Sequence, residues 1–299
     1  MSEHEPLCIL MVHAHPDDEC LSTGGVLARY TAEGINTVLI IATGGEEGEI
    51  VVPEMNTPEN LANLRTIRDQ ELACAVDALG VRHLERLGYR DSGMIDTPAN
   101  NHPDCFHMAD KDEAIARVVR LIRRYRPQVV VTYDERGGYG HPDHIACHLA
   151  TVAAFDAAGD PARYPGTGQP WTPLKLYYTA FPRQAVYTAW QIMRERGMQT
   201  PLDDPNFDAS RFTVEDDRIT TTVPIHDYLP QKRQAIDCHV TQIRKDSPFL
   251  SMPEDISLEL FGVEHFIRVA SQVAVPEGRV ENDLFAGIRT LPEPERMGE

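Results

Sequence analysis

Two histidines and three carboxylates crowd the segment VHAHPDDE at residues 12–19, immediately after the apolar run LCILM. So many ionisable groups in one turn repel one another or lose hydration unless a ligand holds them, and a divalent metal is the simplest candidate. A second segment, DERGGYGHPDH at residues 134–144, repeats the HPD tripeptide. The two segments together indicate one shared site.

A catalytic zinc ion usually takes three ligands from His, Asp or Glu and leaves a fourth position for water. His15 and Asp18 lie three residues apart in the first segment, and His144 lies in the second. Two nitrogens and one oxygen suit zinc or ferrous iron better than magnesium or calcium. Asp17 would then be free to act as a general base, although local spacing does not decide which of Asp17 and Asp18 binds the metal. The alternative is that one of them only caps a helix that begins near Leu21.

The segments around these residues predict an α/β fold. Five short apolar segments are typical of β-strands, and four longer segments between them carry apolar residues at helical spacing. The strand candidates are residues 7–12, 37–42, 83–87, 128–133 and 174–179, and the helix candidates are residues 21–32, 61–79, 112–125 and 143–157. This alternation predicts a Rossmann-like three-layer fold, with a mostly parallel sheet and helices on both faces.

The expected strand order would bring the two ionisable segments together. In such sheets ligands bind beyond the carboxyl ends of the strands, commonly between the first and the fourth strand. Residues 12–19 follow the first strand candidate, and residues 134–144 follow the fourth. If the common order applies, the two loops face one another across that crevice.

The last third of the chain has a less regular pattern. We expect residues 1–185 to form the catalytic core and residues 186–299 to form a smaller α+β lobe that packs on the core and completes the substrate cleft. Helical spacing predicts helices at residues 184–196 and 229–239, and the segment HFIRVAS at residues 265–271 predicts another short helix.

Composition narrows the classes of function. The chain has 299 residues with a formal net charge of −18, which opposes binding to nucleic acid or to an anionic membrane surface. No apolar stretch reaches the length of a membrane span, and the N-terminus lacks the basic start of a signal peptide, so we expect a cytoplasmic protein. The six cysteines show no CxxC pair or regular spacing, which predicts reduced thiols.

The motif HPDDE at residues 15–19, followed by GGYGHPDH at residues 137–144, resembles the paired motifs of the zinc-dependent N-deacetylases of the PIG-L/LmbE type. The resemblance runs from about Leu7 to Tyr178. It implies that His15, Asp18 and His144 are the metal ligands, with Zn²⁺ as the cofactor and Fe²⁺ as the other compatible ion.

The same resemblance implies further roles. Asp17 would be the general base, and His141, oriented by Asp143, would be a general acid or an electrostatic stabiliser. Tyr139 would polarise the amide carbonyl. Amide hydrolysis needs these roles because water must be activated, negative charge on oxygen stabilised and the departing amine protonated.

The resemblance also implies that Glu49, Arg68 and Asp91 contact the substrate. Arg and Asp suit polyol recognition because together they supply donors and acceptors. Without the resemblance, Arg68 would be read as a solvated helix residue and Glu49 as part of a charged loop.

The function implied is a metal-dependent hydrolase that cleaves the N-acyl bond of a 2-amino-sugar conjugate, a small-molecule substrate. Within the family the chain is similar to two mycothiol branches, a deacetylase and an S-conjugate amidase. Segments such as DSGM, HPDHIACH and WTPLKLYY look more like the amidase, but the turn CLSTGG lacks the lysine that the amidase carries there. The sequence is also compatible with a homo-oligomer.

Two other classes of function remain open. A non-catalytic Rossmann-like module for a nucleotide or another ligand is disfavoured because the first strand candidate is followed by HAHPDDE and not by GxGxxG. A nucleophilic hydrolase using Cys20 or Cys147 is also disfavoured, since neither thiol has a recognisable base and orienting partner.

Overall fold

The centre of the structure is a seven-stranded sheet with the order β3-β2-β1-β4-β5-β7-β6. The computed structural model describes residues 6–204, 208–246, 250, 252–275 and 278–289. The strands are β1 (Cys8–His13), β2 (Asn36–Thr43), β3 (His83–Tyr89), β4 (Val129–Thr132), β5 (Lys175–Ala180), β6 (Thr221–Pro224) and β7 (Val263–Ser271). The five strand candidates of the first two thirds of the chain are confirmed, and those five strands are parallel.

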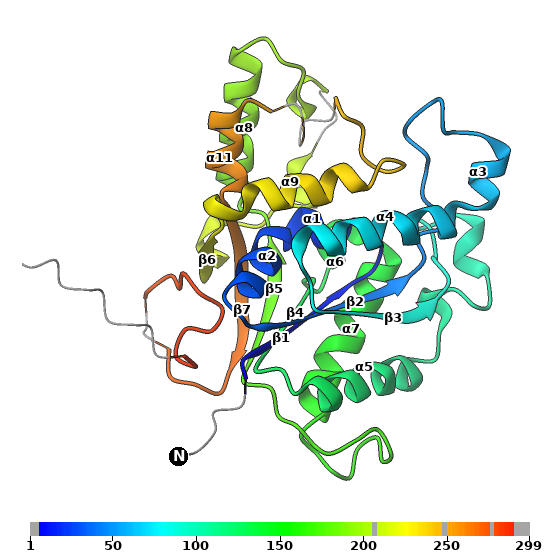
Figure 1. Ribbon diagram of the computed structural model, residues 1–299, viewed down its shortest axis with the longest axis vertical. Coiled ribbons are helices and arrows are strands. Elements are labelled where there is room, and N and C mark those ends of the chain that lie inside the picture. Colours follow the sequence, from blue (N-terminus) through cyan, green and yellow to red (C-terminus); the bar gives the residue numbers. More distant parts are fainter. Residues whose placement is uncertain (1–5, 205–207, 247–249, 251, 276–277, 290–299) are drawn as a thin grey trace, which may run out of the picture.

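Helices cover both faces of the sheet, which confirms the three-layer prediction (Figure 1). The helices are α1 (Asp18–Ser22), α2 (Gly24–Ala32), α3 (Pro58–Ala62), α4 (Leu64–Leu79), α5 (Lys111–Tyr125), α6 (Gly137–Gly140), α7 (Pro142–Ala157), α8 (Arg183–Glu195), α9 (Leu229–Cys238) and α11 (Glu254–Phe261). Single 3₁₀ turns lie at Pro98–Asn101, Phe106–Met108, Pro201–Asp203, Ala209–Arg211, Asp216–Arg218 and His226–Tyr228. Within the described residues, no helix combines the length and the apolar character that a membrane span needs.

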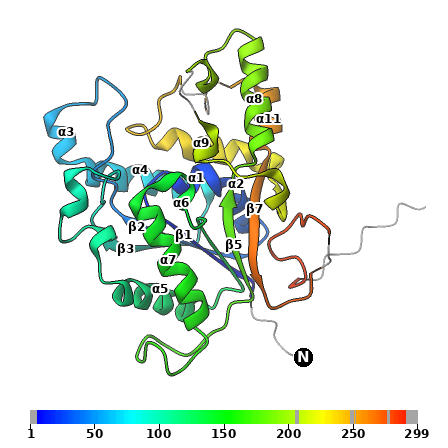
Figure 2. The same ribbon diagram turned by 180° about the vertical axis from the view of Figure 1, so that it is seen from behind.

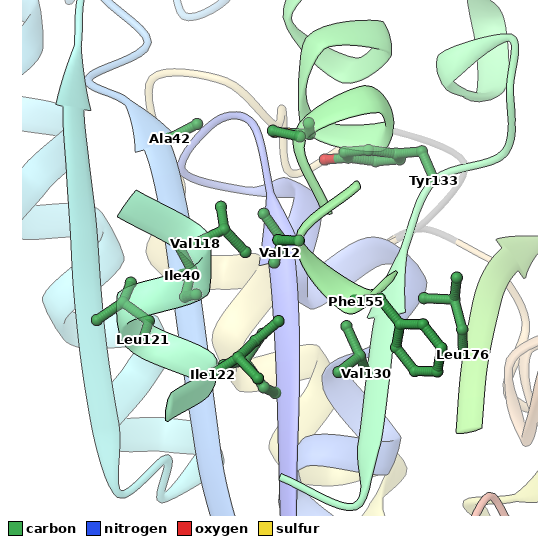
Figure 3. Packing of buried hydrophobic residues seen from close by; sticks show 14 of the residues in the cluster. Val12, Ile40, Ala42, Val118, Leu121, Ile122, Val130, Tyr133, Phe155 and Leu176 are labelled. Atoms are coloured by element: carbon green, nitrogen blue, oxygen red, sulfur yellow. The ribbon is translucent and has the colours of Figure 1, made fainter. Parts of the chain in front are cut away.

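The side chains of β1 point alternately to the two faces of the sheet, so they contribute to two core clusters, and all six residues of the strand are buried. Leu10 and Val12 pack on the side of α5 and α7, whereas Ile9 and Met11 pack on the side of α2, α4 and α9. Figure 3 shows the first side, where side chains of α5 lie over those of β1, β2 and β4. Burial of each large apolar side chain contributes about 1.5–3 kcal/mol, so a strand buried on both faces anchors the sheet.

Strand β1 lies between β2 and β4, which confirms the expected strand order. Leu10 pairs with Val38 of β2 on one side and with Val130 of β4 on the other, and both pairings are parallel. The loops that follow β1 and β4 therefore leave the sheet at the same edge and next to each other.

The prediction of a helix at residues 265–271 is wrong. This segment belongs to β7, which pairs antiparallel with both β5 and β6. Phe266 and Ile267 are buried in the sheet, and the β-branched residues of the segment fit a pleated surface. Pairing with β5 is a contact across about ninety residues, which a short window of sequence does not show. The predicted helices at residues 184–196 and 229–239 are confirmed as α8 and α9.

The C-terminal part of the chain thus extends the central sheet and adds a small apolar cluster beyond it. In Figures 1 and 2, α8 and α11 stand side by side past the end of β5. Val186, Trp190 and Met193 of α8 pack there against Met252 and Ile256. The division of the chain at residue 185 stays a prediction.

The prediction that all six cysteines are reduced is wrong for two of them. Cys74 of α4 and Cys238 of α9 form a disulfide across 164 residues of sequence, whereas Cys8, Cys20 and Cys105 are free and buried, as is Cys147. Spacing along the chain did not indicate this pair, because α4 and α9 meet only when both pack on the same face of the sheet.

We predict that Cys74→Ser lowers the free energy of unfolding by about 2–4 kcal/mol, because the disulfide restricts a long loop of the unfolded chain. Urea unfolding of Cys74→Ser, Cys238→Ser and the double variant measures this. Since both residues contribute to one bond, the double variant should lose no more stability than either single variant. Additive losses, or six titratable thiols in the denatured, unreduced protein, would contradict the disulfide.

Candidate metal and catalytic site

The loop after β1 is held in an unusual backbone conformation. Asp17 has φ 124°, a region that residues other than glycine rarely adopt. Its N–H donates to Oε2 of Glu19 at 2.9 Å, and its carbonyl oxygen accepts the thiol of Cys20 at 2.9 Å. The N–H of His15 donates to Oδ2 of Asp18 at 2.8 Å. These bonds fix the directions in which the side chains of Asp17 and Asp18 leave the loop.

The loop after β4 is held close to the start of α7. Asp134 accepts the N–H of Gly138 at 2.7 Å, which folds residues 134–138 into a tight turn. Gly137 has φ 63°, and a Cβ there would lie 2.7 Å from Cβ of His144. Only glycine allows the loop to approach His144 this closely. Helix α7 begins directly afterwards and carries His144 on its first turn.

Three side chains from the two loops converge as the sequence predicts. Nδ1 of His15, Nε2 of His144 and Oδ2 of Asp18 form a triangle with sides of 3.2, 3.4 and 3.4 Å. Ligands about 2.0–2.1 Å from a tetrahedral zinc ion are about 3.3–3.4 Å apart. The donor set and its spacing therefore fit a zinc-like metal. The ring nitrogens of His15, His141 and His144 also lie within 4.8 Å of one another, so the set with His141 is a geometric alternative.

Carboxylates orient the far nitrogen of His15. Its Nε2 lies 3.2 Å from Asp143 and 3.5 Å from Asp91. Burial disfavours charge on the ring, but the surrounding carboxylates outweigh burial and raise the pKa of His15 well above its usual value. Burial likewise opposes the charge on Asp18, but His144 and His15 outweigh it and lower the pKa of that carboxyl. A carboxylate behind a histidine ligand fixes the ring and strengthens it as a donor.

Asp143 bonds His15 with its carboxylate and His141 with its backbone N–H. Its Oδ2 also accepts the N–H of Ser92 at 2.9 Å, and its own N–H donates to Nδ1 of His141 at 3.2 Å. Because Nδ1 of His141 accepts this bond, the neutral ring carries its hydrogen on Nε2. Burial, together with His15 and His144 nearby, lowers the pKa of His141 to about 4. At neutral pH the ring is therefore a neutral hydrogen-bond donor.

Asp17 stands beside the triangle and is paired with Arg68. Its Oδ2 lies 3.2 Å from Nη2 of Arg68, which also donates to the carbonyl oxygen of Pro16, while Nη1 donates to Gly45. Burial raises the pKa of Asp17, Arg68 lowers it and Asp18 raises it again, which together place it at about 6. A carboxylate with a pKa close to neutrality suits a general base.

The remaining predicted residues lie at different depths. Arg68 and Asp91 are buried and hydrogen-bonded within the protein, where Asp91 accepts the N–H groups of Gly93 and Glu47. Glu49 is exposed on the surface and is not brought into the cluster. Tyr139 is 49% exposed, with its ring 4.9 Å from that of His144.

Sequence comparison places these motifs in a known family. The family model described as GlcNAc-PI de-N-acetylase, PIG-L, matches residues 10–155. A relative from Acidothermus cellulolyticus, named 1D-myo-inositol 2-acetamido-2-deoxy-alpha-D-glucopyranoside deacetylase, is 44% identical and covers 94% of each chain. A relative of the same name from Geodermatophilus obscurus is 42% identical over 94% of this chain and 97% of its own. The chain belongs to the PIG-L family.

Solved structures agree with this fold. The N,N'-diacetylchitobiose deacetylase from Pyrococcus horikoshii superposes with a TM-score of 0.60 at 18% identity, covering 88% of this chain and 84% of that one. At this identity the similarity shows the shared fold alone. The arrangement of the sheet and its helices is therefore shared with that protein.

In this PIG-L protein, several buried side chains outside the metal triangle also support the site, although the paired sequence motifs do not indicate them. Tyr133, the last residue of its predicted strand, stacks on His144 with ring centres 4.2 Å apart. His13 lies between Tyr133 and Thr23, and burial lowers its pKa to about 4. Nδ1 of His148 bonds the carbonyl oxygen of Tyr133 at 3.0 Å.

The structure disfavours a cysteine nucleophile. Cys20 and Cys147 are both fully buried, and burial raises the pKa of each thiol well above its usual value. The thiolate is the reactive form of cysteine, so a raised pKa makes both thiols inert near neutral pH.

A buried ion pair beneath Asp17 was not foreseen. Nε2 of His239 lies 2.8 Å from Oε1 of Glu19, and both side chains are fully buried. The other oxygen of Glu19 accepts the N–H of Asp17. Burial opposes charge on His239, but Glu19 outweighs it and raises the pKa of His239. His239 follows α9, so 220 residues of chain separate the partners, and no sequence motif indicates this contact.

We predict that His239→Ala lowers the free energy of unfolding by about 3–5 kcal/mol, because it leaves Glu19 buried without its partner. Chemical denaturation followed by circular dichroism measures the change. His107→Ala is the control, since His107 is exposed and a surface change should stay within about 0.5 kcal/mol. Equal effects of the two substitutions would contradict the buried pair.

Proposed function

We propose that the protein is a zinc-dependent hydrolase that cleaves the N-acyl bond of a 2-amino-2-deoxyglucose conjugate. The observation that carries the proposal is the triangle of His15, Asp18 and His144 with the ionisable Asp17 beside it. Family membership and the deacetylase names of the relatives support the same reaction class. Ferrous iron suits the two-nitrogen, one-oxygen set as well.

His15, Asp18 and His144 would hold the metal. The metal would supply Lewis acidity, which lowers the pKa of water and polarises an amide carbonyl. Asp143 and Asp91 would keep the ring of His15 in its ligating orientation. The backbone bond from His15 to Asp18 would hold the carboxylate toward the same point.

Asp17 would accept the proton of the attacking water, and Arg68 would keep Asp17 ionised near neutral pH. His141 carries its hydrogen on Nε2 and would donate it toward the carbonyl oxygen as negative charge develops there. Tyr139 would add a second donor, because a tyrosine hydroxyl, with its usual pKa of about 10, is protonated at neutral pH. The proton taken by Asp17 would then pass to the departing amine.

Amine release by zinc-loaded protein tests the proposal directly. The relatives are named for an acetamido substrate, so an N-acetylglucosaminide linked to inositol is the first compound to try. A glucosaminide with an S-conjugated acyl-cysteine tests the amidase branch. No amine from either compound, despite bound zinc, would overturn the assignment to amino-sugar amides.

We predict that Asp17→Asn keeps one zinc per chain but lowers kcat by about 10²–10⁴-fold, because it removes the base and not a ligand. Asp18→Ala should lose the metal. Zinc content by mass spectrometry and steady-state kinetics measure the two effects. His141→Ala is the matched control for the metal, and loss of zinc from it would favour the alternative ligand set.

We predict that Arg68→Gln moves the acid limb of the kcat/KM profile upward by about one pH unit. The base must be deprotonated, so activity falls as the pH drops through its pKa, and removal of the guanidinium raises the pKa of Asp17. Arg65→Gln is the control, because Arg65 lies on the same helix and pairs with Glu46 instead. A raised KM with an unchanged pH profile would instead support substrate contact by Arg68.

A further inference from the structure

A cavity of about 310 Å³ opens directly beside the proposed metal site. Its lining includes Asp18, Tyr139 and His144 at the proposed metal site, and we call this end of the cavity its mouth. From there the cavity runs between the end of β5, helix α8 and β7. We call this space the acyl chamber.

Most residues in the walls of the acyl chamber are apolar beyond its mouth. They include Phe181, Pro182, Val186, Trp190, Met252 and Phe261. These residues come from the end of β5, from α8 and from the α11 region, which stand together past the sheet in both ribbon views (Figures 1 and 2). An apolar cavity of this size with a few polar groups at one end is typical of a small-molecule site.

Charged groups in the wall are already paired. Nζ of Lys232 lies 2.7 Å from Oε1 of Glu264, and the two oxygens of Glu264 accept the N–H groups of Gly25 and Val26. His265, also in the wall, bonds Oγ1 of Thr222 at 3.0 Å. A sugar or inositol ring loses its hydrogen bonds to water on burial and needs several replacements, whereas most residues that line this cavity are apolar.

We propose that the acyl chamber binds an aliphatic acyl chain longer than acetyl, with the sugar left on the polar side of the metal site. The inference rests on the proposed amide hydrolysis. Of the two parts of such a substrate, the sugar carries hydroxyl groups that need hydrogen bonds, whereas an aliphatic acyl chain consists of carbon and hydrogen beyond the carbonyl. Hydrolysis breaks the C–N bond and forms a C–O bond, water giving hydroxyl to the acyl group and hydrogen to the amine, so the chamber releases a fatty acid.

Chain-length dependence of binding and turnover tests the proposal. N-acetyl, N-butanoyl, N-hexanoyl and N-octanoyl glucosaminides are titrated calorimetrically into the zinc-loaded Asp17→Asn variant, and kcat/KM is measured with the wild type. Each buried methylene should tighten binding about three- to fourfold until the chamber is full. If binding does not strengthen for chains longer than acetyl, the assignment of the cavity as the acyl site is wrong. Tighter binding without wild-type turnover of any compound would overturn the proposed function and leave the chamber standing.

A filled chamber provides a second test. Ala185 of α8 lines the cavity, and Ala185→Phe should lower the ratio of octanoyl to acetyl kcat/KM by about tenfold or more, since the ring occupies the space of the chain. Gln191→Phe places the same ring on the exposed side of α8 and should leave the ratio unchanged. Equal ratios in both variants and the wild type would contradict the assignment.

Discussion

The parallel pairing of β1 with β4 is the constraint on which the candidate site depends. It sets two loops side by side that are about 120 residues apart in the chain, and each loop brings part of the ligand triangle. Neither loop contains the set alone, because His15 and Asp18 leave one strand and His144 begins the helix after the other. The apolar burial of β1 on both faces fixes this pairing, so core packing and site geometry have one origin.

Concentrating carboxylates and histidines at one point costs free energy through desolvation and repulsion. The protein offsets this cost by placing an oppositely charged or hydrogen-bonding partner beside these groups. Asp143 and Asp91 lie behind His15, Arg68 lies beside Asp17, and the Glu19–His239 pair lies beneath the backbone of Asp17. The pairing lets Asp17 keep a backbone conformation that an isolated loop would avoid.

The C-terminal segment completes the site from a distance. β7 pairs with β5 and extends the sheet, α9 brings His239 under the first loop, and α8 and α11 surround the cavity that opens at Tyr139. The disulfide joins α9 to α4, the helix that carries Arg68. The helix that carries Arg68, the partner of Asp17, is thus linked covalently to the helix that precedes His239, the partner of Glu19.

The sequence by itself determined the five parallel strands, their helices and the convergence of His15, Asp18 and His144, because buried parallel strands and repeated HPD segments leave strong local patterns. The family followed from those motifs. Only the tertiary structure decided that residues 265–271 form a strand, that Cys74 meets Cys238, that Asp143 faces His15 and that His239 lies under Glu19. Each of these depends on elements far apart in the chain, whose contacts arise from packing on a common sheet and leave no periodic or spacing signal.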